Sequence, residues 1–392
     1  MESLIFLVYD CISLAIKLRI MIKNSIYLVL ISIITLSCQN KKQNTQMLNS
    51  SYSFFIGTYT DTESKGIYKL RMDEKGYFGE LQLQAETVNP SFLCFANNGK
   101  NLLAVNEINT LDGAGSVESY EIGEDLNLIS RKSSGGAHPC FVTANDDGLV
   151  LTANYTGGNT GLLKVDKDGK LSELLDVNQH EGSGTVEGRQ DAPHAHSIWF
   201  QPNKDRVIAV DLGTNELWIS KISKDKFKAV ENNRIQLSEG AGPRHLTFHP
   251  NGKYLYVISE LDNTISQVQI SKNGYELVSN TSTLPVEFDG TSYTADIHIS
   301  SDGKFLYGSN RGHNSIVIYE VSDNGNLSFV GHESTRGDHP RNFSLSPDGK
   351  YLLVANQNTN NLVSFSRDET TGLLTFVDEL KVPKPVCILF EK

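Results

Sequence analysis

Several arginine side chains stand at the ends of short apolar runs, where their charge is suited to binding an anion. Three of them are Arg244, Arg311 and Arg341, and Arg189 lies in a polar stretch at 180–193. A guanidinium group binds carboxylate or phosphate through paired hydrogen bonds. Because the chain is acidic, with a net charge of −11, the presence of four of its eleven arginines at these positions predicts an anionic ligand.

Other side chains that can move protons or form hydrogen bonds occupy the same places. Apolar runs are preceded by His138, His194, His196 and His245, as well as by Arg244 and Arg341. They are followed by Asn106, Glu107, Asn154, Tyr155, Asp211, Glu260, Asn310, Arg311, Asn356 and Gln357. Asn and Asp often end strands only because they form turns, and this interpretation applies to Asn106, Asn154 and Asn356. No metal site is expected at His194 and His196, because no further ligands are arranged beside them.

A repeated unit of strands positions these side chains. It consists of an apolar strand, a turn that usually contains Gly-Lys, and a second apolar strand that ends in Asn, Asp or Glu. The unit occurs at 90–106, 139–154, 196–211, 244–260, 296–310 and 341–356. A third strand and a short fourth strand follow each pair. A repeat of about 50 residues that contains four strands is typical of a propeller blade.

The two ends of the repeat region supply a seventh, split blade. Residues 385–390 resemble a first strand with nothing after it, whereas 53–60 and 66–71 resemble a second and a third strand with nothing before them. Pairing these ends closes the ring and removes exposed strand edges. The sequence therefore predicts an all-β fold, a seven-bladed β-propeller of four-stranded blades over residues 52–392, in preference to an open solenoid.

Strand alternation then decides which side chains share a face. The start of the first strand and the end of the second lie at the same end of a blade, beside the central channel. We call this side the funnel face; the Gly-Lys turns lie on the opposite face. The arginines, the histidines and Glu260 are all expected on the funnel face, together with the stretch at 180–193.

Composition narrows the function further. A net charge of −11 without a basic stripe argues against a nucleic-acid partner. Cysteines at positions 11, 38, 94, 140 and 387 show neither disulfide nor metal-like spacing, so Cys94, Cys140 and Cys387 are expected to be buried free thiols. No glycine-rich phosphate loop opens a helix, and no cofactor is expected.

The N-terminus predicts export. Met21 begins a short basic segment, 26–36 is apolar, and Cys38 follows a small residue. This order is typical of a lipoprotein signal peptide. Met21 is the expected start, so 1–37 would comprise an upstream segment and the signal peptide, Cys38 would be lipidated, and 38–51 would be a linker. The protein would then face the periplasm or the cell surface, bound to the membrane by its lipid alone. A membrane-spanning helix over 4–36 is the alternative, although three basic residues interrupt it.

Several motifs resemble one known family. They are Gly242-Pro-Arg-His245, Pro193-His-Ala-His196, Asp211-Leu-Gly213, Ser309-Asn-Arg-Gly312 and Pro340-Arg-Asn-Phe343. Together with the repeats they span roughly residues 52–390 and resemble the lactonase family of seven-bladed propellers. Its members are of the 6-phosphogluconolactonase type or, in a fungal branch, the carboxy-muconate lactonizing enzyme type. The resemblance implies that the protein is a lactone hydrolase.

The resemblance also implies roles for individual residues. The catalytic set would be His196, Arg244, Glu260 and Arg311, with Arg341 as an alternative to Arg311. The substrate would be bound by His138, Tyr155, Arg189, His194, His245 and Arg341. Family members also tend to carry an Arg-Gln pair, which in this chain stands at 189–190.

These side chains suit direct attack of water on a lactone. Arg244 and Arg311 can hold the substrate anion and the oxyanion, and His196 or Glu260 can act as general base. No Gly-x-Ser-x-Gly motif provides a serine nucleophile. Because an exported protein would meet little 6-phosphogluconolactone, another sugar-acid lactone is the expected substrate. The alternatives are a lactonizing cycloisomerase and a non-catalytic propeller that binds a carbohydrate or a protein.

Overall fold

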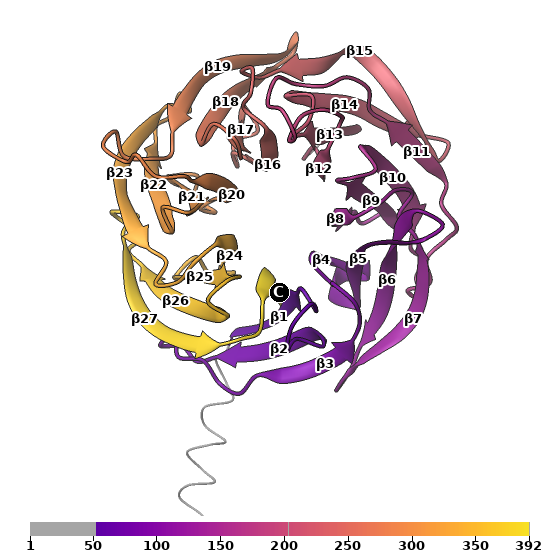
Figure 1. Cartoon of the computed structure of the whole chain (residues 1–392), viewed down its shortest axis with the longest axis horizontal. Helices are drawn as coiled ribbons and strands as arrows, with labels where there is room; N and C mark the ends of the chain where they lie inside the picture. Colours follow the sequence, from indigo (N-terminus) through magenta and orange to yellow (C-terminus); the bar gives the residue numbers. More distant parts are fainter. Residues whose placement is uncertain (1–51, 203, 392) are drawn as a thin grey trace, which may run out of the picture. The chain divides into compact units, whose positions relative to one another are not determined.

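The computed structural model describes residues 52–202 and 204–391, which form a ring of seven four-stranded antiparallel sheets (Figure 1). The all-β, seven-bladed prediction is therefore confirmed. The strands of a blade are named from the innermost to the outermost. Blade 1 contains β28 (Pro385–Phe390), β1 (Tyr52–Thr58), β2 (Gly66–Met72) and β3 (Gln82–Glu86). Blade 2 contains β4 (Leu93–Ala96), β5 (Asn101–Leu111), β6 (Ala114–Ile122) and β7 (Leu126–Ser133).

The other five blades follow in chain order. Blade 3 contains β8 (Pro139–Ala144), β9 (Leu149–Asn154), β10 (Asn159–Lys164) and β11 (Asp176–Gln179). Blade 4 contains β12 (Ala195–Phe200), β13 (Arg206–Asp211), β14 (Glu216–Ser223) and β15 (Lys226–Gln236). Blade 5 contains β16 (Pro243–Phe248), β17 (Tyr254–Ser259), β18 (Thr264–Ser271) and β19 (Gly274–Ser282). Blade 6 contains β20 (Tyr293–Ile299), β21 (Phe305–Arg311), β22 (Ser315–Val321) and β23 (Leu327–Ser334). Blade 7 contains β24 (Pro340–Leu345), β25 (Tyr351–Asn356), β26 (Asn361–Arg367) and β27 (Leu374–Lys381).

Apolar side chains of neighbouring blades form the core. Between blades 4 and 5, for example, Ile208 and Val210 of β13 pack with Leu255 and Val257 of β17, and all four are buried. β13 and β17 are therefore covered by apolar side chains on both faces, which explains their nearly continuous apolar sequences. The tight turn at Gly303, with a φ of +74°, uses a conformation that favours glycine.

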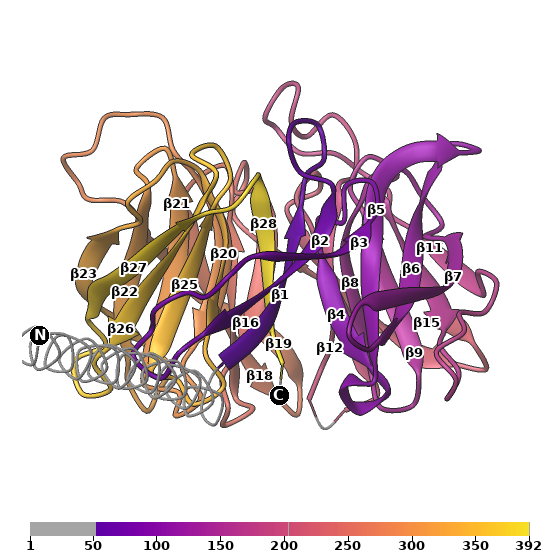
Figure 2. The same cartoon turned by 90° about the horizontal axis from the view of Figure 1, so that it is seen from below.

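The predicted split blade is also confirmed. β28 pairs with β1 in antiparallel register, with Phe54 opposite Phe390 and Ile56 opposite Ile388. Figure 2 shows β28 and β1 side by side, and it shows the longer connecting loops on one face of the ring. Because the first and last strands share a sheet, the blades close into a ring without an open edge between the chain ends.

The register of the innermost strand is interrupted at the funnel face in six blades. In four of them the skipped residue is a single residue at the candidate site. The register skips one residue between Pro139 and Phe141, between Ala195 and Ser197, between Pro243 and His245, and between Pro340 and Asn342. The residues left without a ladder partner are Cys140, His196, Arg244 and Arg341. A bulge turns a side chain away from its regular direction and is common beside functional sites.

The predictions for the N-terminus lie outside the described residues. They concern the upstream segment and signal peptide over 1–37, the start at Met21, the lipidation of Cys38 and the linker 38–51, and they stay predictions. In the described part of the chain, no helix is long and apolar enough to cross a membrane. The described residues contain one short 3₁₀ helix, η2 (Asn97–Gly99).

Candidate active site

Glu260 lies at the centre of an arginine cluster on the funnel face. Its Oε1 atom is 2.5 Å from a terminal nitrogen of Arg189. Its Oε2 atom is 2.8 Å from a terminal nitrogen of Arg311 and 3.2 Å from Nε of Arg244. Glu260 follows β17 directly, Arg244 occupies the bulge of β16, Arg311 ends β21, and Arg189 comes from the 180–193 connection. Two blades and one loop thus bring these four side chains together.

The arginines determine the charge of Glu260. Burial alone would raise the pKa of its carboxyl, but Arg311, Arg244 and Arg189 outweigh burial and hold that pKa far below its usual value. Burial, Arg341 and Arg311 in turn lower the pKa of Arg244 to about 9. At neutral pH Glu260 is therefore an anion and Arg244 remains a cation.

Backbone carbonyl groups of blade 6 hold two of these arginines in place. A terminal nitrogen of Arg244 donates to the carbonyl of Ala295 at 2.5 Å. Arg311 donates to the carbonyls of Thr294 at 2.6 Å and Tyr293 at 3.3 Å. Nε of Arg244 is close to Glu260 but not aligned for a hydrogen bond. The cluster is consequently fixed before any ligand binds.

His196 occupies the bulge of β12 and is 4% exposed. Burial, followed by the charges of Arg244 and Arg341, holds the pKa of its imidazole well below the usual value. Its Nδ1 atom is 3.7 Å from Sγ of Cys140, and its ring contacts that of Tyr155 edge to face. His196 is therefore a neutral ring at neutral pH.

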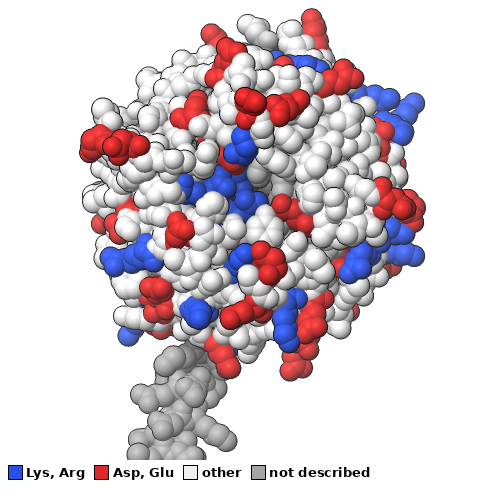
Figure 3. Space-filling model, viewed as in Figure 1, with Lys and Arg blue, Asp and Glu red and all other residues white. Residues whose placement is uncertain are grey.

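A cavity of about 220 Å³ opens beside these residues. Figure 3 shows basic side chains gathered in a hollow near the centre of the ring. The cavity is lined by Tyr59, Glu107, Cys140, Tyr155, Arg189, His196, Glu260, Arg311 and Arg341. Of the predicted catalytic residues, His196, Glu260 and Arg311 line it, and Arg244 contacts Glu260 directly. The predicted substrate-binding residues Tyr155, Arg189 and Arg341 line it as well.

Arg341, Tyr59 and Glu107 form the other side of the cavity. The guanidinium of Arg341 lies 5.3 Å from the ring centre of Tyr59, and the Tyr59 hydroxyl donates to Oε2 of Glu107 at 2.8 Å. In residues 52–202 and 204–391, no carboxylate forms an ion pair with Arg341. Strand alternation predicted Glu107 on the funnel face but gave it no catalytic or binding role. Tyr59 was not among the predicted site residues. The signal for Tyr59 was its position, because it follows the second strand of the split blade.

Three predicted substrate-binding histidines do not line the cavity. His245 is buried, and its Nδ1 atom is 2.8 Å from a carboxylate oxygen of Asp296. His194 stacks on the ring of Tyr155 and has its Nδ1 atom 2.9 Å from the carbonyl of that residue. Nδ1 of His138 is 2.9 Å from the hydroxyl of Thr156. The contacts of His194 and His245 are those of supporting residues.

The connection at 180–193, which carries Arg189, is anchored by buried polar groups. Gln190 donates to Asn215 at 2.6 Å and to the carbonyl of Leu212 at 2.7 Å. At Gly213 an added Cβ would lie 1.9 Å from the carbonyl oxygen of Ala192, so glycine allows the two segments to approach. The loop is thus fixed against blade 4.

The Asn residues at the ends of the second strands have structural roles. The side-chain amide of Asn106 donates to Thr87, that of Asn154 to the carbonyl of Ser134, and that of Asn356 to the carbonyl of Thr335. All three Asn side chains are buried. They tie each of these three blades to the segment that enters it, so their role is structural, although the sequence had predicted turn formation instead.

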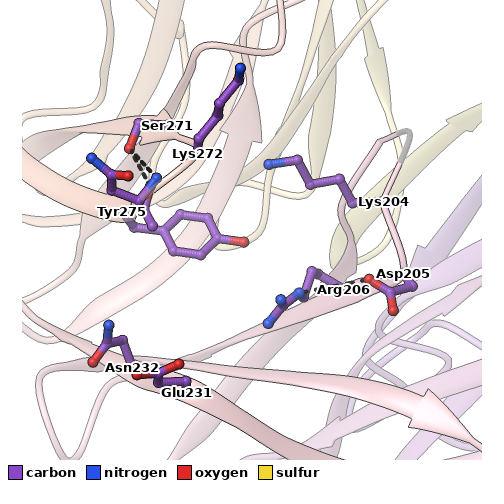
Figure 4. Close-up of a pocket in the computed structure, with 10 residues that line it drawn as sticks. Lys204, Asp205, Arg206, Glu231, Asn232, Ser271, Lys272 and Tyr275 are labelled. Atoms are coloured by element: carbon purple, nitrogen blue, oxygen red, sulfur yellow. Dashed lines mark hydrogen bonds and ion pairs between the residues drawn. The ribbon is translucent and has the colours of Figure 1, made fainter.

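A second cavity, of about 310 Å³, lies on the opposite face between blades 4 and 5. Figure 4 shows Lys204, Arg206 and Lys272 around the ring of Tyr275. The Tyr275 hydroxyl donates to Gln201 of the neighbouring blade at 2.6 Å. This cavity is lined by neither histidine nor cysteine, and its tyrosine links two blades, so it offers less for catalysis.

Comparison with known proteins agrees with the motifs. The family described as "Lactonase, 7-bladed beta-propeller" matches residues 53–390. The 6-phosphogluconolactonase of Bacillus subtilis is 37% identical over 350 residues, which are 87% of this chain and 99% of that protein. The periplasmic gluconolactonase of Pseudomonas aeruginosa superposes with a TM-score of 0.82 at 31% identity, covering 87% of this chain and 99% of that one. The chain therefore belongs to the lactonase family of seven-bladed β-propellers.

Proposed function

We propose that this lactonase hydrolyses a sugar-acid lactone in the cavity of the funnel face. The observation that supports this most directly is the cluster of Glu260 with Arg189, Arg244 and Arg311. It lies beside the neutral His196 and the cavity that His196 lines. Fixed cations next to a cavity are suited to stabilising the negative charge that develops on a carbonyl oxygen.

The reaction needs three operations. A water oxygen bonds to the lactone carbonyl carbon, the ring C–O bond breaks, and the departing alkoxide takes up a proton. We assign the oxyanion to Arg311 and Arg244, because backbone carbonyls and Glu260 hold both guanidinium groups in place. We assign the anionic group of the substrate or product to Arg341, which lines the cavity without a paired carboxylate in the described residues.

Glu260 is poorly suited to accept the water proton. Arginine nitrogens lie against both of its oxygens, and its pKa is held far below the usual value. An efficient general base has a pKa near the working pH. Of the two bases that the sequence offered, His196 or Glu260, we therefore assign Glu260 to aligning the arginines. The proton acceptor is then sought among the other groups that line the cavity, which include His196 and Glu107.

The substrate that we propose is an unphosphorylated sugar-acid lactone that carries a separate, free carboxylate. The lipoprotein signal at Cys38 predicts export, and one relative is a periplasmic gluconolactonase. Within the cavity, Arg189 and Arg311 are shared with Glu260, which leaves Arg341 as the lining cation without an ion pair in the described residues. One available guanidinium fits a single carboxylate better than a phosphate dianion together with an oxyanion.

Acid release in a pH-stat tests this function. The purified protein is assayed with 6-phosphogluconolactone, gluconolactone, galactonolactone and a muconolactone. Glu260→Gln is expected to reduce turnover at least about 100-fold, because the arginines lose their common partner. Glu276→Gln, at an exposed position of β19, is the matched control and should match wild type. A folded wild-type protein that opens none of these lactones would contradict the proposal and favour a binding propeller. If the protein closed a lactone ring faster than it opened one, the result would favour a cycloisomerase.

A further inference from the structure

We propose that Glu107 accepts the proton of the attacking water and is a catalytic residue of this site. This assignment rests on the proposed lactone hydrolysis. Two features of the cavity support it. The carboxylate of Glu107 lines the cavity and has one oxygen without a hydrogen bond from the described residues. Arg341 also lines the cavity and forms no ion pair with a described carboxylate. Glu107 was not among the residues that the family resemblance implied as catalytic.

The backbone around Glu107 is built to hold it at the cavity. β5 loses its regular register with β6 between Asn106 and Leu111, so Glu107 lies where the ladder is interrupted. Its backbone N–H donates to the carbonyl of Asn89 at 3.0 Å. The side-chain oxygen of Asn89 in turn accepts from the backbone N–H of Thr60 at 2.9 Å. Asn89 thus fixes Glu107 and the segment that carries Tyr59 relative to each other.

The two oxygens of Glu107 differ in their contacts. Oε2 accepts a hydrogen bond from the Tyr59 hydroxyl at 2.8 Å. No hydrogen bond or ion pair reaches Oε1 from the rest of the described chain. Glu260 differs, because each of its oxygens lies against a guanidinium group. Glu107 therefore has one oxygen oriented by a neighbour and one oxygen available to a water molecule in the cavity.

The other candidates lining this part of the cavity are less suitable proton acceptors. Burial together with Arg244 lowers the pKa of His196 strongly, so its imidazolium form is disfavoured. Burial raises the pKa of the Cys140 thiol to about 12, so it stays protonated at neutral pH. Burial also raises the pKa of the Tyr59 phenol, which keeps the hydroxyl as a donor to Glu107.

The proposed step balances in atoms and charge. Oε1 of Glu107 takes one proton from water as the water oxygen bonds to the carbonyl carbon. The tetrahedral intermediate then expels the ring oxygen, and the protonated Glu107 returns its proton to that alkoxide. The products are a hydroxy acid, which ionises in solution, and the original carboxylate. The charged or titratable groups that face Glu107 are Tyr59, Cys140 and Arg341.

Chemical rescue tests the assignment. Glu107→Ala in the full chain is expected to lower kcat by about 10²- to 10⁴-fold, the usual contribution of a general base. KM should change by no more than about threefold, because the substrate contacts remain. Added formate can occupy the vacated space and should restore part of the lost turnover in Glu107→Ala, but none in the Glu260→Gln variant. Glu121→Ala, at an exposed position of β6, is the matched control.

Glu107→Gln keeps the shape of the side chain and covers the case in which the alanine variant fails to fold. It should lose turnover to the same extent while binding the hydroxy-acid product with unchanged affinity in calorimetry. Turnover within about tenfold of wild type in Glu107→Gln would overturn the assignment. The assignment would also be overturned if weaker binding of the product by Glu107→Gln accounted for the whole loss of turnover, since Glu107 would then be a binding residue. A wild-type protein inactive on all lactones would instead refute the proposed function itself.

Discussion

The two sides of the funnel-face cavity use the same residue types in opposite ways. On the side of blades 4 to 6, one carboxylate, Glu260, is shared by three arginines, and backbone carbonyls hold two of these arginines. On the side of blades 1, 2 and 7, Glu107 and Arg341 line the cavity without an ion pair between them. Paired charges fix geometry before the reaction, whereas unpaired ones remain available to bind or to exchange a proton.

Removing a guanidinium from the paired side should have the largest effect. Arg244→Ala is expected to lower kcat by about 10³-fold, because it removes a fixed cation that stabilises the oxyanion. Glu260 keeps Arg189 and Arg311 as partners, so the variant should still fold. Steady-state kinetics on the best lactone measures the effect, with Arg206→Ala at the second cavity as control. Wild-type turnover in Arg244→Ala would remove this arginine from the mechanism.

Removing the guanidinium from the unpaired side should act on binding. Arg341→Ala is expected to raise KM by about 10- to 100-fold with kcat changed much less, because Arg341 grips an anionic group in ground and transition state alike. Arg341→Lys should recover only part of the loss, since an ammonium group cannot form a paired contact. An unchanged KM together with a lower kcat would instead place Arg341 at the oxyanion.

The paired side should also make stability depend on pH. The pKa of Glu260 is held far below its usual value of 4.5, so its ionised form stabilises the fold. This contribution is fully present above about pH 4.5 and is lost as the pH falls further. Glu260→Gln should therefore lose about 2 kcal/mol less than wild type between pH 7 and pH 3. Urea unfolding at the two pH values measures the difference, with Glu121→Gln as control. Equal losses in wild type and Glu260→Gln would mean that the arginines do not stabilise the ionised carboxylate.

The fold could be predicted almost completely from the sequence because the same pattern of strands repeats along the chain. Six copies of one strand pair defined the blade, and the unmatched ends at 53–60 and 385–390 implied a split seventh. The same alternation assigned Arg244, Glu260 and Arg311 to one face, and the structure brings them into contact.

Contacts within the site were less predictable, for three physical reasons. Arg244 and His245 are adjacent in the sequence, but the bulge directs Arg244 to Glu260 while His245 contacts Asp296. The residue pattern of a single strand does not predict such a bulge. Tyr59 was missed because the strand predicted at 53–60 ran past it, whereas β1 ends at Thr58 and leaves Tyr59 directly after the second strand of its blade. The pairing of Glu260 with three arginines depends on distances across blades, which strand alternation does not provide.

The inner-strand bulges make the centre of this propeller modular. Each of the four side chains that a bulge places at the candidate site belongs to a different sheet, and its backbone lies outside the regular ladder of that sheet. A substitution at one bulge can therefore change a chemical group at the channel without altering the hydrogen bonds that hold a neighbouring blade. The ring provides a set of separate attachment points, so its chemistry can diverge one residue at a time while the surrounding architecture stays the same.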